Sequence, residues 1–354
     1  MGTMPTPETE ERSALEYASV VREAVACGRH DAIAIAQPRG LAIAEQRLDR
    51  NPRRPAAAGV LVRRCEADRG RVSTVGAIGA AAAASLIDEL ETWPKPGLVS
   101  HVDSGSHTDM DAGTFRRSAA AIEPFYAELA AAGAAGAGMD ELRRIGVDAE
   151  RAMLAATNGV NTHRGAIFGL GLLSAAAGAV LSAERPLPPS GASSQCAALV
   201  LGAIVRQRWG RAILTGAIPL HSHGTNALRR YGVGGARAEA AAGFPLALQV
   251  GLPALRLGRQ LAPGNDMAPR VQAFFALLAA VDDTNLLHRG GVAGLEYART
   301  AAHTFLAGGG VDQPGWIETA VALHQGFVSR RLSPGGCGDL LAITLFLDRL
   351  ETEF

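Results

Sequence analysis

Beyond about residue 73, apolar residues recur at spacings of three and four, which is the periodicity of an amphipathic helix. Glycine and proline clusters separate the periodic runs and mark helix ends. We find no sustained alternation of the kind that marks strands. Helices are expected at Val75–Glu91, Ala112–Ala132, Asp140–Ala156, Gly165–Ala183, Ala192–Arg208, Thr225–Tyr231, Ala236–Val250, Ala268–Val281, Val292–Leu306, Asp312–Ser329 and Gly338–Leu350. The pattern predicts an all-α fold, with one large helical domain at 73–354 and its site on loops and helix ends.

Residues 1–72 have a different pattern. The stretch from Gln37 to Arg71 is rich in arginine, contains three prolines and shows little periodicity. Such a composition favours a poorly structured, partly disordered N-terminal extension. The segment Met1–Arg12 has no basic region followed by an apolar run, so no secretory signal is predicted.

One predicted helix is apolar enough to require a membrane test. Gly165–Ala183 contains no charged residue, and its length is near the minimum for a bilayer span. It lacks an aromatic belt and flanking basic residues, so we expect a buried helix, capped by Thr162, and no membrane partner. The cysteines are far apart and form no C-x-x-C pair, which favours a reduced, cytoplasmic compartment. They are Cys27, Cys65, Cys196 and Cys337.

The net charge argues against nucleic acid as a partner. The 34 basic and 34 acidic residues balance, so no overall basic field attracts a polyanion. An anionic ligand must therefore be bound by a local group of residues.

The loop Pro94–Asp111 is the most polar interruption of the helical pattern. It holds two histidines, three aspartates and Lys95, which is the only lysine of the chain. A compact ammonium suits a tight phosphate pocket better than a guanidinium does. The alternative is that one lysine survived by chance on a solvated loop. Sequence alone leaves both interpretations open.

Four further polar clusters interrupt the helices, at 159–165, 223–245, 282–291 and 332–339. They place arginines beside glycine-rich turns and helix N-termini, which suits polyphosphate binding. The candidate phosphate- or nucleotide-binding residues are Lys95, Gly97, Asn161, His163, Arg164, His223, Arg237, Arg289, Ser333, Gly335 and Gly336.

Carboxylates near hydroxyl and amide oxygens suggest a magnesium ion. Asp109, Asp111 and Asp283 are the candidate ligands, because Mg²⁺ prefers oxygen donors and often binds one or two carboxylates plus substrate phosphates. The alternative is that these aspartates are helix caps or solvated side chains.

These clusters, in this order and spacing, resemble the triphosphoribosyl-dephospho-coenzyme A synthase family. The resemblance covers about residues 73–350, with Val102 and Cys337 where family patterns more often show Arg or Ser. The matching motifs are PKPGLV at 94–99, SGSHTDMD at 104–111, GVNTHRGAIF at 159–168, HG, RRYG, GARAEA and GFP between 223 and 245, DTNLLHRGG at 283–291 and LSPGGCGDLLA at 332–342.

The resemblance implies a pentosyl transfer from ATP to the 2′-hydroxyl of 3′-dephospho-coenzyme A, with release of adenine. Because the family product is α-linked whereas ATP is β-linked, the resemblance also implies a single displacement that inverts the anomeric carbon. The product would supply the prosthetic group of an acyl carrier protein, loaded by a holo-acyl carrier protein synthase. Malonate decarboxylase is preferred here over citrate lyase as the destination, and a homodimer stays an open possibility.

The transfer develops positive charge on the ribose, which a carboxylate would stabilise, and the accepting hydroxyl needs a base. Asp109, His107 and Glu239 are the candidate catalytic residues. Magnesium would orient the triphosphate.

Two rival functions stay open at this point. A magnesium-dependent, ADP-ribosylglycohydrolase-like hydrolase would send water to the same anomeric carbon. A non-catalytic nucleotide-binding partner of a decarboxylase complex would release no adenine.

Overall fold

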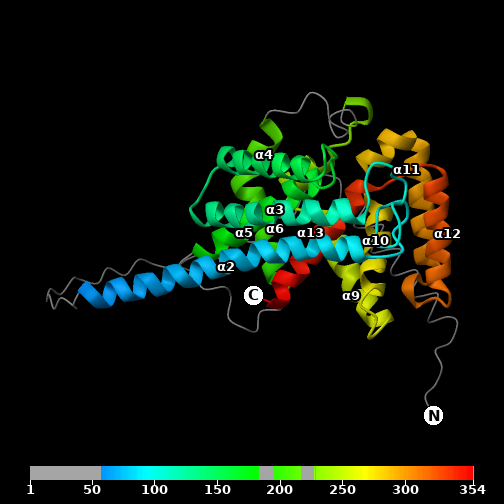
Figure 1. Ribbon diagram of the computed structural model, residues 1–354. Coiled ribbons are helices and arrows are strands. Elements are labelled where there is room, and N and C mark those ends of the chain that lie inside the picture. Colours follow the sequence, from blue (N-terminus) through cyan, green and yellow to red (C-terminus); the bar gives the residue numbers. More distant parts are fainter. Residues whose placement is uncertain (1–56, 183–194, 217–226, 228, 354) are drawn as a thin grey trace, which may run out of the picture. The chain divides into compact units, whose positions relative to one another are not determined.

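The structure is a computed structural model that describes residues 57–182, 195–216, 227 and 229–353 (Figure 1). By spatial contacts the chain divides into Met1–Ser73 and Thr74–Phe354. All regular elements of the described residues are helices, so the predicted all-α class is confirmed. The first described helix begins at Ala57, well before the predicted start at Val75.

The helices follow the predicted order, and most boundaries agree within a few residues. They are α2 (Ala57–Glu91), α3 (Ala112–Ala134), α4 (Met139–Ala156), α5 (Arg164–Ser182), α6 (Gln195–Thr215), α8 (Gly235–Ala241), the π-helix η1 (Ala247–Gly251), α9 (Leu252–Leu261), α10 (Ala268–Ala280), α11 (Thr284–Ala307), the 3₁₀ helix η2 (Gly310–Asp312), α12 (Trp316–Ser329) and α13 (Gly335–Glu353). Of the predicted helix Thr225–Tyr231, residues 227 and 229–231 are described, and they are helical.

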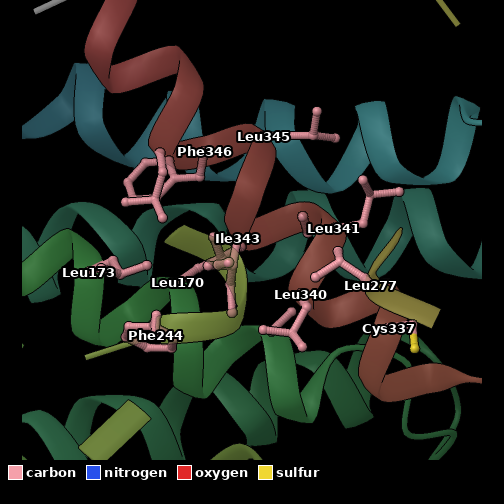
Figure 2. Close-up of a cluster of buried hydrophobic side chains, with 14 of the residues drawn as sticks. Leu170, Leu173, Phe244, Leu277, Cys337, Leu340, Leu341, Ile343, Leu345 and Phe346 are labelled. Atoms are coloured by element: carbon pink, nitrogen blue, oxygen red, sulfur yellow. The ribbon is translucent and has the colours of Figure 1, made fainter. Parts of the chain in front are cut away.

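α13 lies at the centre of the core of the second unit. It contacts α5, α6, α9, α10 and α11. Figure 2 shows its side chains in one apolar cluster with Leu170 and Leu173 of α5 and Leu277 of α10. A helix that is apolar on most of its surface is a buried helix. This packing fixes the position of the N-terminus of α13, which lies within the polar motif 332–339.

α5 is the helix that required a membrane test on sequence. Its length and hydropathy would allow it to cross a bilayer, but 67% of its most apolar window is buried inside the protein. It packs against α3, α4, α6 and α13. The expectation of a core helix is therefore met.

Glycines allow α3 and α5 to pack backbone against backbone. A Cβ on Gly178 would lie 1.8 Å from the carbonyl oxygen of Ala130, and one on Gly133 would lie 1.9 Å from that of Ala175. Neither position has room for a methyl group, so the two helices approach closely only because both residues lack a side chain.

Gly178→Ala is expected to lower the free energy of unfolding by about 1–3 kcal/mol, because the helices must separate to admit the methyl group. Chemical denaturation measures this. The matched control is Gly146→Ala on α4, where nothing lies within 4 Å of the new Cβ. That change is expected to stabilise the helix by about 0.5–1 kcal/mol, so equal effects of the two substitutions would contradict the packing argument.

The single helix predicted at Ala236–Val250 is wrong. α8 ends at Ala241, and the chain turns through Gly243 (φ 86°) and Phe244 (φ 62°) before η1. A Cβ on Gly243 would lie 2.5 Å from the carbonyl oxygen of Gly202, so this turn packs directly against α6. The turn places the Phe244 ring in the core, where it is 2% exposed.

Candidate active site

The loop Pro94–Asp111 lies against the segment that precedes α13. The hydroxyl of Ser106 donates to the carbonyl oxygen of Leu332 at 2.6 Å. Gly97 has a φ of 74°, and a Cβ there would lie 2.1 Å from the same oxygen. Gly97, predicted to bind phosphate, is thus required here by a close backbone contact that joins two motifs far apart in sequence.

His107 stands at the point where these two motifs meet. Its Nε2 is 2.8 Å from Oγ of Ser333, and its Nδ1 is 3.5 Å from Oδ1 of Asp109. The third neighbour is Arg289, whose Nη2 is 3.3 Å from Nδ1. Burial and the Arg289 charge lower the pKa of His107, against the opposing effect of Asp109. The imidazole is therefore neutral near neutral pH and able to accept a proton.

Arg289 comes from α11 and reaches across to both other segments. Its Nη1 donates to the carbonyl oxygens of Ser106 at 3.2 Å and Arg331 at 3.1 Å. The side chain is exposed. Four of the predicted site residues, His107, Asp109, Arg289 and Ser333, are thus brought together from three separate motifs.

The side chain of Lys95 is fully buried and paired with Glu89 of α2. Burial lowers the pKa of the lysine and raises the pKa of the glutamate, while their mutual attraction opposes both shifts. The ammonium predicted to bind phosphate is thus enclosed and already bonded to a carboxylate. Glu89 was missed on sequence, although it continues the buried stripe of Ile78, Ala82 and Ser85.

Asp283 is the N-cap of α11 and also joins α11 to α13. Its Oδ1 accepts from the amides of Asn285 at 2.8 Å and Leu286 at 3.0 Å, and its Oδ2 accepts from the amide of Cys337 at 2.9 Å. Burial raises the pKa of Asp283 in spite of these hydrogen bonds. A Cβ on Gly336 would lie 2.9 Å from Oδ2, so this predicted phosphate residue is a glycine that admits the carboxylate.

Gly335 has a similar steric role on the same turn. A Cβ there would lie 2.6 Å from the side-chain nitrogen of Asn285. Both glycines therefore allow the start of α13 to approach the start of α11.

Asp339 of α13 is a second acid that the sequence analysis did not select. Its carboxylate accepts from the amide of Ala166 in α5, and its Oδ2 occupies the space that a Cβ on Gly165 would need, 2.0 Å away. Burial, together with the charges of Glu89 and Asp283, raises its pKa well above the usual range. The side chain that tethers α13 to the start of α5 is thus an acid inclined to hold its proton.

The motif at 159–165 forms the start of α5. The side chain of Asn161, rather than the predicted Thr162, accepts from the amide of Arg164 at 3.2 Å. Arg164 pairs with Glu150 on α4. His163 is 3% exposed and 2.6 Å from the hydroxyl of Ser118, and burial, followed by the charge of Lys95, lowers its pKa to about 3.

The remaining predicted residues have contacts elsewhere. Arg237 donates to carbonyl oxygens at the end of α6, including that of Gly216 at 3.0 Å. Glu239 accepts from the amide of Leu246 at 2.7 Å, and burial raises its pKa to about 7. The contacts described for both residues are with α6 and the turn after α8, not with His107. His223 lies outside the described residues.

The three aspartates predicted to bind magnesium do not form one site. Oδ1 of Asp111 caps α3 by accepting from the amide and hydroxyl of Thr114, both at 2.7 Å, and these bonds lower its pKa. Asp283 is occupied by backbone amides, and Asp109 lies beside His107. Among the described residues, no three histidine, cysteine or acidic side chains form a group that could hold a metal ion. We therefore derive no step through a protein-bound metal.

The starts of α5, α11 and α13 converge through Asp339 and Asp283. Amides in the first turns of α11 and α13 are bonded to Asp283, and the amide of Ala166 in α5 is bonded to Asp339, so these carboxylates already occupy the helix N-termini. The fold and the site thus define an all-α protein in which polar motifs far apart in sequence meet at His107.

Comparison with known proteins identifies the family. Residues 76–354 match the family described as ATP:dephospho-CoA triphosphoribosyl transferase (CitG), and the chain belongs to it. The family suggested by the sequence motifs is thereby confirmed, and it is a family of transferases that use ATP and dephospho-coenzyme A.

Curated relatives carry the name "Probable 2-(5''-triphosphoribosyl)-3'-dephosphocoenzyme-A synthase". The protein of Acinetobacter calcoaceticus is 36% identical over 272 residues, which cover 76% of this chain and 89% of that protein. The protein of Stutzerimonas stutzeri is 41% identical over 273 residues, with coverages of 75% and 89%. "Synthase 1" of Salmonella choleraesuis is 40% identical over 278 residues, with coverages of 77% and 90%. No solved structure matches the chain.

Proposed function

We propose that this chain makes 2′-(5″-triphosphoribosyl)-3′-dephospho-coenzyme A from ATP and 3′-dephospho-coenzyme A, with release of adenine. Family membership over residues 76–354 is the observation that carries the proposal. The site is compatible with it, because three motifs meet at His107, beside the exposed guanidinium of Arg289, which suits a phosphate group.

The reaction forms a bond between O2′ of the acceptor and C1″ of the ATP ribose while the bond from C1″ to N9 of adenine breaks. The acceptor hydroxyl loses a proton, and adenine gains one. His107 is the proposed base, because its lowered pKa keeps it neutral and it lies beside an exposed arginine. Asp109, beside Nδ1, would stabilise the imidazolium that forms.

Glu239 stays a second candidate for the base. Its pKa of about 7 is suited to proton transfer at neutral pH, although its described contacts are with the turn after α8.

The destination of the product is part of the proposal. We assign it to the acyl carrier subunit of malonate decarboxylase, through a holo-acyl carrier protein synthase, with citrate lyase as the alternative. General motif resemblance supports this choice. Incubating the product and that synthase with each apo-carrier, and weighing the carriers by mass spectrometry, would distinguish the two. A cytoplasmic location, supported by the widely spaced cysteines, and a homodimer also stay predictions.

Magnesium also stays a prediction, with the ion expected to arrive bound to the triphosphate of ATP. Removing divalent ions with a chelator and restoring Mg²⁺ would test it, with product formation as the readout.

The decisive experiment incubates the full chain with ATP, Mg²⁺ and 3′-dephospho-coenzyme A and identifies the product by mass. Product and adenine are expected in equal amounts, and intact coenzyme A serves as a control for the free 3′ position. Adenine with free ribose triphosphate in the absence of acceptor would favour the hydrolase. No adenine release at all would favour the non-catalytic nucleotide-binding protein.

A further inference from the structure

The two ring nitrogens of His107 face different surroundings. Nε2 faces Ser333, which is 3% exposed and lies 2.8 Å away. Nδ1 faces Asp109, whose side chain is 59% exposed, and the exposed Arg289. Nδ1 therefore lies on the side of the ring whose neighbours are exposed.

The neighbours also determine which nitrogen carries the proton. A guanidinium has donors only, so the contact with Arg289 at 3.3 Å is a hydrogen bond only when Nδ1 acts as an acceptor. In the neutral ring the hydrogen then sits on Nε2 and is donated to Oγ of Ser333. Asp109, 3.5 Å from Nδ1 and at the outer limit of a hydrogen bond, favours the opposite tautomer, but Arg289 is the nearer of the two neighbours.

The lone pair that could take a proton is thus occupied by Arg289. Its other hydrogen bonds are to two uncharged acceptors, the carbonyl oxygens of Ser106 and Arg331, and the charge of Asp109 also acts on it. A phosphate is a better partner, because charge-assisted, bidentate bonds to arginine are shorter and stronger than bonds to neutral oxygens. A polyphosphate that binds here is therefore expected to replace Nδ1 and the carbonyl oxygens as the partner of Arg289.

We propose that Arg289 masks Nδ1 of His107 until the polyphosphate of a substrate draws the guanidinium away, and that Ser333 is the positioning residue that keeps Nδ1 unprotonated. The proposal rests on the proposed function and adds an order of events to it. Phosphate binding precedes exposure of the base, so the base acts only when a nucleotide is in place.

The transfer moves one proton to the base and one to adenine. The proton of the 2′-hydroxyl moves to Nδ1, and the electron pair of O2′ forms the bond to C1″. The pair of the breaking bond stays on N9 of adenine, which takes up a proton. The imidazolium keeps its Nε2 hydrogen on Ser333 and turns its new Nδ1 hydrogen toward Asp109.

Nitrogen-15 NMR of histidine-labelled protein tests whether Arg289 masks Nδ1 of His107. The experiment needs no catalysis and uses inorganic tripolyphosphate as the probe. His107→Gln assigns the signals. The free wild type is expected to show hydrogen on Nε2 and a hydrogen-bonded Nδ1, and the probe is expected to shift the Nδ1 signal as Arg289 leaves. In Arg289→Met, the Nδ1 signal is expected to lack the hydrogen-bond shift from the start and not to respond.

Three results would overturn the mask: hydrogen on Nδ1 in the free protein, an Nδ1 signal that ignores bound tripolyphosphate, or no binding of the probe by calorimetry. Product formation by the wild type is measured separately. If the NMR results contradict the masking of Nδ1 but product forms normally, the proposed function stands. If the NMR response is the expected one but no product forms, the proposed function is rejected.

Kinetics test the role of Ser333. Ser333→Ala is expected to lower kcat about tenfold or more with the KM for ATP nearly unchanged, and Ser333→Thr is expected to recover most of kcat. A phosphate-binding Ser333 would instead raise that KM, which would refute the positioning role. Thermal unfolding of both variants confirms that they are folded.

Discussion

Lys95→Met is expected to lower the free energy of unfolding by about 3–5 kcal/mol, because it leaves the buried Glu89 carboxylate without its partner. The lysine side chain is 0% exposed and that of Glu89 is 8% exposed, so water does not replace the lost contact. Unfolding by denaturant, followed by circular dichroism, measures the change.

The double variant Lys95→Met with Glu89→Leu removes both charges and is expected to recover most of the lost stability. Arg143→Met is the matched control, since it breaks an exposed pair with Asp140 and should change stability little. A single variant as stable as wild type, or a double variant no better than the single, would refute the buried pair.

The folded double variant also tests the phosphate role predicted for Lys95. If the amine contacts substrate, the double variant should have a raised KM for ATP in spite of its recovered stability. An unchanged KM would mean that Lys95 stabilises the fold and does not contact ATP.

His107→Gln is expected to lower kcat by about 10²–10⁴-fold, because the reaction loses its base. Glutamine can keep a hydrogen bond to Ser333, so the thermal midpoint is expected to stay close to that of the wild type. Product formation from ATP and 3′-dephospho-coenzyme A, followed by mass spectrometry, measures the rate.

The control is His101→Gln on the same loop. His101 also faces a carboxylate, with Nδ1 3.4 Å from Glu91, but its described contacts do not include Ser333 or Arg289. Its kcat is expected to stay within about twofold of the wild type. Equal losses in both variants would remove His107 as the base, and Glu239→Gln would be the next variant to measure.

The helical architecture was predictable because helix formation follows local periodicity. The spacing of apolar residues and the breakers Pro94 and Pro96 placed the end of α2 correctly. The prediction failed at Gly243 and Phe244, where packing against Gly202 on α6 decides the turn. A local pattern holds no information about such a remote neighbour.

The sequence by itself determined the all-α class, the order of the polar motifs and the family they mark. Only the tertiary structure decided which polar groups contact one another. It pairs Lys95 with Glu89, uses Asp283 and Asp111 as helix caps, and joins His107 to Ser333 across more than two hundred residues. Periodicity reports only on neighbours within a few turns of helix, whereas the partner of a buried charge is set by how distant helices pack.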